Sequence, residues 1–221
     1  MVNNMKDYIE DFINGELLGD GHLNKICNKY GEIISVRYQH GTKYKRYLEW
    51  LSDIFDKYDI KQCGNITSYV QKSGFGKGKI SNRYSTLSYK LLIDLYNKWY
   101  KSSKKIVPND LKLNPITIRQ WYIGDGSLQR KDNTFSLKLA TCAFSKNEVM
   151  SLVNKLHDIG INSSMTNDNR IYISVYSIID FFNYIGECPK EIEDIYGYKW
   201  IDNKEKSQIL LKMKKRYLNK N

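Results

Sequence analysis

A ten-residue pattern that occurs twice constrains this chain more than any other feature of its sequence. The first copy runs from Phe12 to Gly21 and the second from Thr117 to Gly126. Each copy is an apolar run that ends in Gly-Asp-Gly, and an offset of 105 residues superposes Asp20 on Asp125. Recurrence at about one domain's length predicts a chain built from two similar halves.

Each copy is predicted to form a helix whose C-terminal end carries the aspartate. Apolar side chains recur at helical spacing, and Pro115 lies just ahead of the second copy, near the place of a first-turn proline. We expect the glycines to end each helix, because glycine accepts positive φ without steric cost. The C-terminal end of the helix dipole is unfavourable for an anion, so a carboxylate there favours a bound cation.

The spacing of two glycines indicates how such helices pack. Gly15 and Gly19 are four residues apart, so one face of the first helix is bare backbone that a second helix can approach. Helices packed side by side would bring Asp20 and Asp125 together, and close carboxylates repel each other unless a divalent metal lies between them. One Gly-Asp-Gly alone is a common turn, but two copies at this separation favour a paired metal site.

The two stretches resemble the paired motifs of LAGLIDADG homing endonucleases, in the single-chain form that carries both motifs. The resemblance implies that the motif helices form the central interface between two half-domains. Two departures are visible: Glu16 stands where the family prefers an aliphatic residue, and Gln120 where it prefers a small one.

The resemblance also implies the ligands and the cofactor. Asp20 and Asp125 would bind Mg²⁺ with help from the carbonyls of Gly19 and Gly124; Mn²⁺ would substitute, and Ca²⁺ would bind without supporting cleavage. Two further catalytic residues follow from the family's lysines near the attacking water, whose positions resemble those of Lys105 and Lys199. Lys104 is a close rival for the first of these positions.

The implied activity is hydrolysis of DNA phosphodiesters by a metal-activated water. The protein would be a monomer that makes a double-strand cut with short 3′ overhangs in a long, asymmetric target, which promotes intron or insert mobility. Two alternatives remain open: an RNA maturase that assists splicing of an intron, and a catalytically inactive DNA-binding relative. Retention of both aspartates favours the nuclease, because binding alone does not need them.

Composition agrees with a nucleic-acid partner. The chain of 221 residues carries 35 Lys and Arg against 24 Asp and Glu, a formal net charge of +11, which suits a polyanion. We expect no membrane partner, because no apolar run is long enough to span a bilayer and no signal peptide is visible. The four cysteines are scattered, which predicts free thiols and an intracellular place, in cytoplasm or an organelle matrix. The three histidines have no ligand spacing and are expected at the surface or in loops.

Beyond the motifs, the chain predicts an α+β fold of two half-domains, residues 1–107 and 108–221, joined by a basic linker at 101–110. Each half has the order helix-strand-strand-helix-strand-strand-helix. Such an order predicts an antiparallel sheet with helices on one face, which leaves the other face open. Residues 1–6 are expected to precede the first helix, and residues 72–78 to form a flexible basic hairpin tip. Further helices are expected at 44–58, 89–100, 145–158, 177–185 and 203–217, and strands at 22–41, 64–71, 79–87, 127–130, 134–141, 161–167 and 170–175.

Alternation along the strands predicts which side chains face DNA. Val36 and Tyr38, like Phe135 and Leu137, would face the core, together with Ile34 and Leu139. The opposite face would form two saddle-like DNA-binding surfaces, since Arg, Lys, Gln and Asn read base edges in the major groove. A slip of one residue would invert each assignment. The predicted DNA contacts are Lys25, Arg37, Gln39, Lys79, Arg83, Arg130, Ser136, Lys138 and Arg170.

Overall fold

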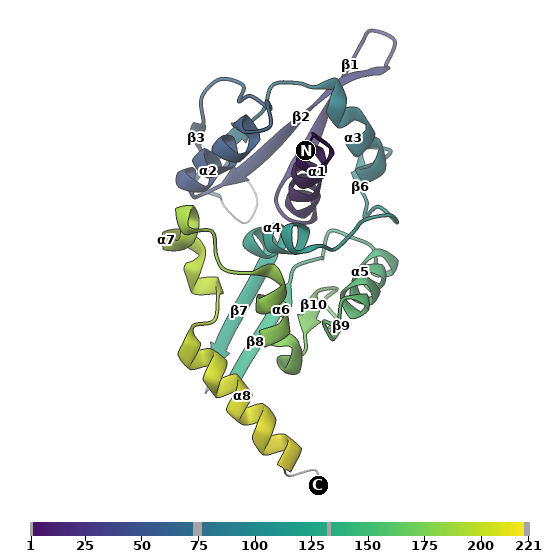
Figure 1. Cartoon of the computed structure of the whole chain (residues 1–221). Helices are drawn as coiled ribbons and strands as arrows, with labels where there is room; N and C mark the ends of the chain where they lie inside the picture. Colours follow the sequence, from purple (N-terminus) through teal and green to yellow (C-terminus); the bar gives the residue numbers. More distant parts are fainter. Residues whose placement is uncertain (1, 73–76, 132–133, 219–221) are drawn as a thin grey trace. The chain divides into compact units, whose positions relative to one another are not determined.

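The structure is a computed structural model that describes residues 2–72, 77–131 and 134–218 (Figure 1). The chain divides into two compact units, Met1–Pro108 and Asn109–Asn221. Each unit contains one antiparallel four-stranded sheet with its own helices. The predicted mixed α+β fold with antiparallel sheets is therefore confirmed. Most of the predicted 72–78 hairpin tip, residues 73–76, lies outside the described residues.

The first unit forms a sheet with the strand order β1-β2-β4-β3. Its 3₁₀ turn η1 runs directly into α3, and a two-stranded hairpin, β5 and β6, follows near the end of the unit. The elements are α1 (Val2–Leu18), β1 (His22–Cys27), β2 (Ile33–Thr42), α2 (Lys45–Asp56), β3 (Thr67–Val70), β4 (Ile80–Ser85), η1 (Lys90–Leu92), α3 (Ile93–Trp99), β5 (Tyr100–Lys101) and β6 (Lys104–Lys105).

An aromatic core joins the helices of this unit to one face of the sheet. Tyr38 of β2 lies 4.8 Å from Phe55 of α2, centroid to centroid, and Phe55 also contacts Tyr84 of β4 and Phe12 of α1. All four side chains are almost completely buried. Burial of the apolar area of these rings stabilises the unit by roughly 25 cal/mol per Å².

Two details differ from the sequence prediction. The helix α1 begins at Val2 and not after Lys6, so residues 2–6 of the expected lead-in are part of the motif helix. Ile34 was expected in the core, but it is 44% exposed. It lies near the free end of the β1–β2 hairpin, which extends past the helices in Figure 1.

The second unit repeats this arrangement with the strand order β7-β8-β10-β9. The elements are α4 (Pro115–Asp125), β7 (Gly126–Lys131), β8 (Thr134–Leu139), α5 (Lys146–Asp158), β9 (Ser163–Met165), β10 (Ile171–Ile173), η2 (Val175–Ser177), α6 (Ile178–Ile185), η3 (Lys190–Ile192), α7 (Glu193–Tyr196), η4 (Gly197–Lys199) and α8 (Asn203–Leu218).

Local signals explain where the helices of this unit begin. The Asn114 side chain accepts hydrogen bonds from the amides of Ile116 and Thr117, each at 3.0 Å, and Pro115 follows at the first helical position. Ser145 and Glu148 form a reciprocal capping box at the start of α5. Prediction missed the short turns η3, α7 and η4, because runs of three or four residues carry no usable periodicity.

The inner face of the second sheet has the predicted alternation. Phe135, Leu137 and Leu139 of β8 are buried, as are Ile171 and Ile173 of β10. Helices α5 and α6 supply the other half of this core with residues such as Leu152, Leu156, Phe181 and Ile185. Within the described residues of each unit, one face of the sheet packs against that unit's helices, and the opposite face is called the open face below.

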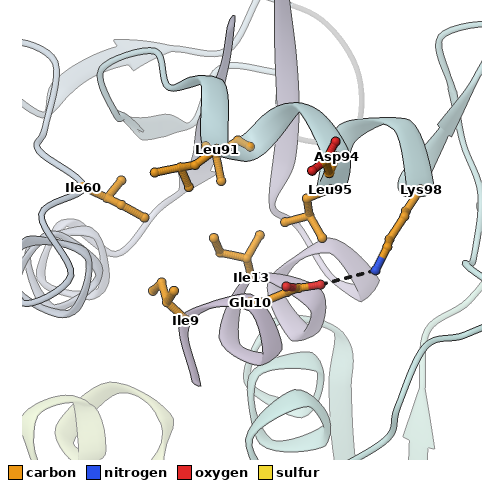
Figure 2. Close-up of a pocket in the computed structure, with 9 residues that line it drawn as sticks. Ile9, Glu10, Ile13, Ile60, Leu91, Asp94, Leu95 and Lys98 are labelled. Atoms are coloured by element: carbon orange, nitrogen blue, oxygen red, sulfur yellow. Dashed lines mark hydrogen bonds and ion pairs between the residues drawn. The ribbon is translucent and has the colours of Figure 1, made fainter. Parts of the chain in front are cut away.

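A groove of about 340 Å³ lies on the helical side of the first unit, away from the open face of the sheet. Figure 2 shows Ile9 and Ile13 of α1 opposite Leu91 of η1 and Leu95 of α3. An ion pair of 3.5 Å between Glu10 and Lys98 lies at its edge. No helix among the described residues is both long and apolar enough to cross a membrane.

Candidate functional site

The first Gly-Asp-Gly forms a tight turn at the end of α1. The amides of Gly19 and Gly21 both donate to the carbonyl of Glu16, at 3.1 and 2.9 Å. This shared acceptor ends the helix and turns the chain into β1. Asp20 lies at the tip of the turn and is exposed to solvent.

Lys105 holds the other carbonyls of this turn. Its Nζ donates to the carbonyls of Leu17 at 3.0 Å, Gly19 at 3.3 Å and Gly21 at 2.8 Å. The ammonium therefore lies against the negative end of the helix dipole. The neighbouring Lys104, the rival for this position, has an exposed side chain.

The second unit builds the same arrangement from different parts. The helix α4 includes Asp125, and the Gly126 amide donates to the carbonyl of Tyr122. Lys199 Nζ donates to the carbonyl of Ile123 at 2.6 Å, and to those of Tyr122 and Gly124 at 3.4 Å. Lys199 is only 7% exposed. In each unit a lysine ammonium thus lies on the last carbonyls of the helix that carries the motif aspartate.

Gly21 and Gly126 serve close packing, and the expectation that the motif glycines supply positive φ is wrong. None of Gly19, Gly21, Gly124 and Gly126 has a positive φ, and Gly126 has a φ of −80°. A Cβ at Gly21 would lie 2.8 Å from the Tyr38 hydroxyl, and a Cβ at Gly126 would lie 2.0 Å from the Tyr122 ring. A larger residue at Gly21 would press against Tyr38 of β2, and one at Gly126 would press against Tyr122 of α4, so either turn would have to shift.

A buried polar cluster lies beneath the first turn. Glu16 is 2% exposed, and its carboxylate accepts from the hydroxyls of Tyr38 at 2.5 Å and Tyr47 at 2.6 Å, and lies 2.9 Å from His40 Nδ1. His40 is itself 2% exposed, so the expectation of a surface histidine is wrong there. Burial, and then the Glu16 carboxylate, raise the pKa of Tyr38 well above its ordinary value, which keeps its hydroxyl a donor. Glu16, the departure from the family pattern, is thus satisfied by partners from β2 and α2.

A polar row crosses the open face of the first sheet next to Asp20. His22 Nε2 donates to Gln39 Oε1 at 3.0 Å, and Gln39 Nε2 donates to Ser85 Oγ at 2.8 Å, which joins β1, β2 and β4. Burial lowers the pKa of His22; the Gln39 bond opposes this shift, and the Lys105 ammonium adds to it. The row fixes the orientation of the Gln39 amide.

Two predicted arginines share this open face with Gln39. In the register of the sheet, Arg37 pairs with Asn24, and Arg83 pairs with Gly41 and Thr67. The Arg83 guanidinium lies 5.1 Å from the centre of the Tyr69 ring. Lys79, also predicted to face DNA, is exposed just before β4 begins.

Lys25 was predicted on the open face, and the register corrects this assignment. Directly opposed residues of an antiparallel pair point to the same face, and Lys25 pairs with Val36, which is fully buried on the helical side. The prediction was off by one residue. The alternation of β2 shows which of its residues face the core, but it does not show which residues of β1 lie opposite them. Asn24 takes the predicted place of Lys25.

The open face of the second sheet carries Ser136 and Lys138 as predicted, and Arg170 directly precedes β10. Ser136 pairs with Gln129, and Lys138 with Ser127 and Tyr172. Arg170 is exposed and forms an ion pair of 3.3 Å with Asp168. Polar residues at Ser127 and Gln129 were missed, since β7 has no alternation strong enough to show its facing.

Arg130 is the second correction. It pairs with Phe135, whose side chain is in the core, so Arg130 lies on the helical side of the sheet. Its guanidinium forms an ion pair with Glu205 and donates to the carbonyls of Tyr198 and Trp200. Gln129 faces the open side in its place.

The oxygen-rich helix ends can attract cations. Within the described residues, no group of three or more His, Cys, Asp or Glu is placed to hold a metal ion. The donors at each helix end are instead one carboxylate and several main-chain carbonyls. Oxygen donors of this kind suit hard divalent cations such as Mg²⁺ and Ca²⁺.

Comparison with known proteins agrees with this geometry. A model of the LAGLIDADG DNA endonuclease family matches residues 10–181, which include both Gly-Asp-Gly motifs. The chain is 31% identical over 159 residues to an uncharacterized protein of Methanocaldococcus jannaschii, covering 70% of this chain and 58% of that protein. It is 31% identical over 186 residues to a probable intron-encoded endonuclease 1 of Wickerhamomyces canadensis, covering 80% and 78%. A cytochrome b mRNA maturase bI2 of Debaryomyces hansenii is 31% identical over 156 residues, covering 69% and 56%. The chain thus spans less than two thirds of the first and third of these relatives.

Solved structures show the same fold. The homing endonuclease I-WcaI bound to its DNA recognition sequence has a TM-score of 0.72 and 27% identity, over 89% of this chain and 87% of that one. I-DmoI in complex with DNA and Ca has a TM-score of 0.55 and 16% identity, over 85% and 96%, and shows the fold alone. Two motif helices in one chain, two antiparallel sheets and these matches lead to one conclusion: the chain belongs to the LAGLIDADG DNA endonuclease family, in its single-chain form.

Proposed function

We propose that this protein is a homing endonuclease that makes a metal-dependent double-strand cut in DNA. The observation that carries the proposal is the repeated helix end: Asp20 beside carbonyls held by Lys105, and Asp125 beside carbonyls held by Lys199. A lysine ammonium on these carbonyls supports the idea that each helix end attracts positive charge.

The two aspartates are the proposed metal ligands, with the carbonyls of Gly19 and Gly124 as additional donors. A bound divalent metal would activate a water for attack and stabilise the charge that develops on the phosphate. Mg²⁺ is the proposed metal ion, and Mn²⁺ is proposed to replace it. Ca²⁺ is proposed to bind at the same place without supporting cleavage. I-DmoI, which shares this fold, has been solved with its target DNA in the presence of Mg and in complex with DNA and Ca, which supports a divalent ion here.

Other residues of the chain hold the DNA and the catalytic turn. Lys105 and Lys199 fix the carbonyl ends next to each aspartate, so the carboxylates are presented in a defined orientation. The open faces supply phosphate and base contacts through the side chains that remain assigned there: Arg37, Gln39, Lys79, Arg83, Ser136, Lys138 and Arg170. We further propose that each unit is one LAGLIDADG half-domain, residues 1–107 and 108–221.

The two open faces differ in sequence, which supports an asymmetric DNA target that a monomer cuts. The proposed cut leaves short 3′ overhangs. Its proposed outcome is the movement of an intron or insert. The maturase of D. hansenii favours a second candidate, in which the protein also assists splicing of an intron RNA. A catalytically inactive DNA-binding relative is the third, and the paired aspartates argue against it.

One experiment separates these functions. The protein is incubated in Mg²⁺ with a plasmid that carries the intron-free or insert-free host gene, and ends are mapped on both strands. We expect linear product, loss of all cutting in EDTA, and loss of double-strand cutting in Asp20→Asn and Asp125→Asn with DNA binding retained. Asn keeps the shape of the side chain but loses the charge that holds the metal. If both variants still linearise the plasmid at the wild-type rate, the aspartates are not the site.

A further inference from the structure

Three consecutive main-chain carbonyls around Lys199 are each held by a side chain. Arg130 Nη1 donates to the carbonyl of Tyr198 at 2.8 Å, and Arg130 Nη2 donates to that of Trp200 at 2.8 Å. The Tyr122 hydroxyl donates to the carbonyl of Lys199 itself at 2.5 Å. The segment is a single 3₁₀ turn, η4, followed by an extended residue, so it forms few hydrogen bonds of its own.

The guanidinium that holds two of these carbonyls is itself fixed by Glu205. Arg130 Nε donates to one oxygen of Glu205, and Nη2 lies 3.1 Å from the other. Glu205 is held in turn at the start of α8, where its amide donates to Asp202 Oδ1 at 2.7 Å and its carboxylate accepts from the Asp202 amide at 3.0 Å. A planar guanidinium bound in two directions is a rigid support, which a flexible ammonium cannot reproduce.

These bonds leave Arg130 little capacity to bind DNA. The four bonds use most of the five N–H donors of a guanidinium. The pairing with Phe135 also directs the side chain to the helical side of the sheet. The charge of Arg130 is largely compensated by Glu205, which raises the pKa of the arginine.

We propose that Arg130 is a positioning residue of the second unit: it fixes the backbone on both sides of Lys199 and makes no DNA contact. This inference rests on the proposed role of Lys199 beside Asp125. Lys199 Nζ reaches the carbonyl of Ile123 at 2.6 Å, so a shift of its backbone moves the ammonium relative to the motif helix. Displacement of a reacting group by about 1 Å can cost about 100-fold in rate.

The first unit supports its lysine in another way. Lys105 lies in the β5–β6 hairpin, paired with Tyr100, and the next amide, of Ile106, donates to the carbonyl of Trp99 at 2.7 Å. Lys25, the counterpart of Arg130 at the offset of 105 residues, lies in β1 and is exposed. Loss of Arg130 should therefore impair one unit and spare the other.

Arg130→Met and Arg130→Lys test the proposal, with Lys138→Met as the matched control from the open face of the same sheet. In the full protein without DNA, we expect faster amide hydrogen exchange in the 197–200 segment of both Arg130 variants and no change in Lys138→Met. Single-turnover cleavage on strand-labelled plasmid should slow by about 10- to 100-fold on one strand in both Arg130 variants, so that nicked product accumulates. The DNA dissociation constant and its salt dependence should stay at wild-type values, whereas Lys138→Met should lower the log–log salt slope by about 1.

Cleavage rates of the single and double variants at Arg130 and Lys199 show whether Arg130 acts through Lys199. If Arg130 acts through Lys199, then Arg130→Met should slow cleavage no further in a Lys199→Met background. The proposal is overturned if Arg130→Met weakens DNA binding and lowers the salt slope, if Arg130→Lys restores wild-type cleavage, or if the exchange of residues 197–200 is unchanged. Should Arg130→Met not fold, Tyr122→Phe removes the third carbonyl bond alone, and it too must slow one strand without weakening binding. If the wild-type protein cuts no DNA, the proposed function fails, and the exchange experiment still decides whether Arg130 holds the segment.

Discussion

At the scale of single residues, Glu16 shows how a departure from a family pattern can be accommodated. A carboxylate in the middle of an otherwise apolar helix face is costly to bury unless every oxygen has a donor. Tyr38, Tyr47 and His40 supply those donors from two other elements. The backbone carbonyl of the same residue accepts the amides of Gly19 and Gly21. Glu16 therefore connects the core of the first unit to the turn that presents Asp20.

Replacement of Glu16 tests this connection. We expect Glu16→Leu to lower the free energy of unfolding by about 3 kcal/mol, because two buried hydroxyls and an imidazole lose their acceptor. Glu16→Gln should cost less, since it keeps one acceptor. Urea denaturation measures both, and Glu16→Leu combined with Tyr38→Phe and Tyr47→Phe should recover part of the loss. A Glu16→Leu protein as stable as the wild type would show that the cluster contributes nothing.

His22 offers a second test at this scale. Burial and the Lys105 ammonium lower its pKa, so the imidazole should titrate below 6.5, and Lys105→Met should move the midpoint upward. The His22 imidazole binds a proton more readily in the unfolded chain than in the folded protein. Its contribution to the free energy of unfolding therefore falls as the pH drops below 6.5 toward the pKa of the folded state. NMR titration of the His22 ring measures the midpoint directly, and a wild-type value above 6.5 would contradict the assignment.

At the scale of elements, each sheet separates two tasks by its two faces. The helical face forms the core and, in the second unit, the support of Lys199 by Arg130. The open face presents Arg37, Gln39 and Arg83 in the first unit and Lys138 in the second. Parity along the strand decides which face a residue occupies, so a shift of one position changes a proposed DNA contact into a residue of the helical face.

The open faces should account for DNA binding. We expect Arg37→Ala and Lys138→Ala each to weaken binding and to lower the log–log salt slope by about 1, because each removes a phosphate contact, while thermal stability changes little. Binding isotherms at several salt concentrations give the slope. Lys25→Ala is the matched control, because Lys25 of β1 lies on the helical side of the sheet. An equal loss of DNA affinity in this variant would contradict the assignment of the open face.

At the scale of the whole molecule, the chain carries two units of similar architecture and different detail. Each has a motif helix, an antiparallel sheet and a lysine on the last carbonyls of the helix. The first unit contains the Glu16 cluster, and the second has Trp121 at the matching position and an additional helix, α8. Two unequal units in one chain match an asymmetric site better than a palindrome.

A monomer is the expected state in solution. Both motifs are present in one chain, so a second copy is not needed to complete the pair of aspartates. Sedimentation equilibrium at micromolar concentration should return a mass near 26.0 kDa, with one protein per DNA duplex in the complex. An obligate dimer without DNA would contradict this prediction.

The sequence by itself determined the longer helices, the paired Gly-Asp-Gly motifs, the α+β class and the inward residues of β8. These depend on periodicity within one segment, which is a local property. Only the tertiary structure decided which face Lys25 and Arg130 occupy, because facing depends on the register between two strands and a shift of one residue inverts it. It also decided that His40 is buried beside Glu16, and that Lys105 rather than Lys104 lies on the carbonyls of α1. Those contacts join residues 24 to 88 positions apart in the chain, and no local pattern encodes which distant donor a buried carboxylate or a helix end will meet.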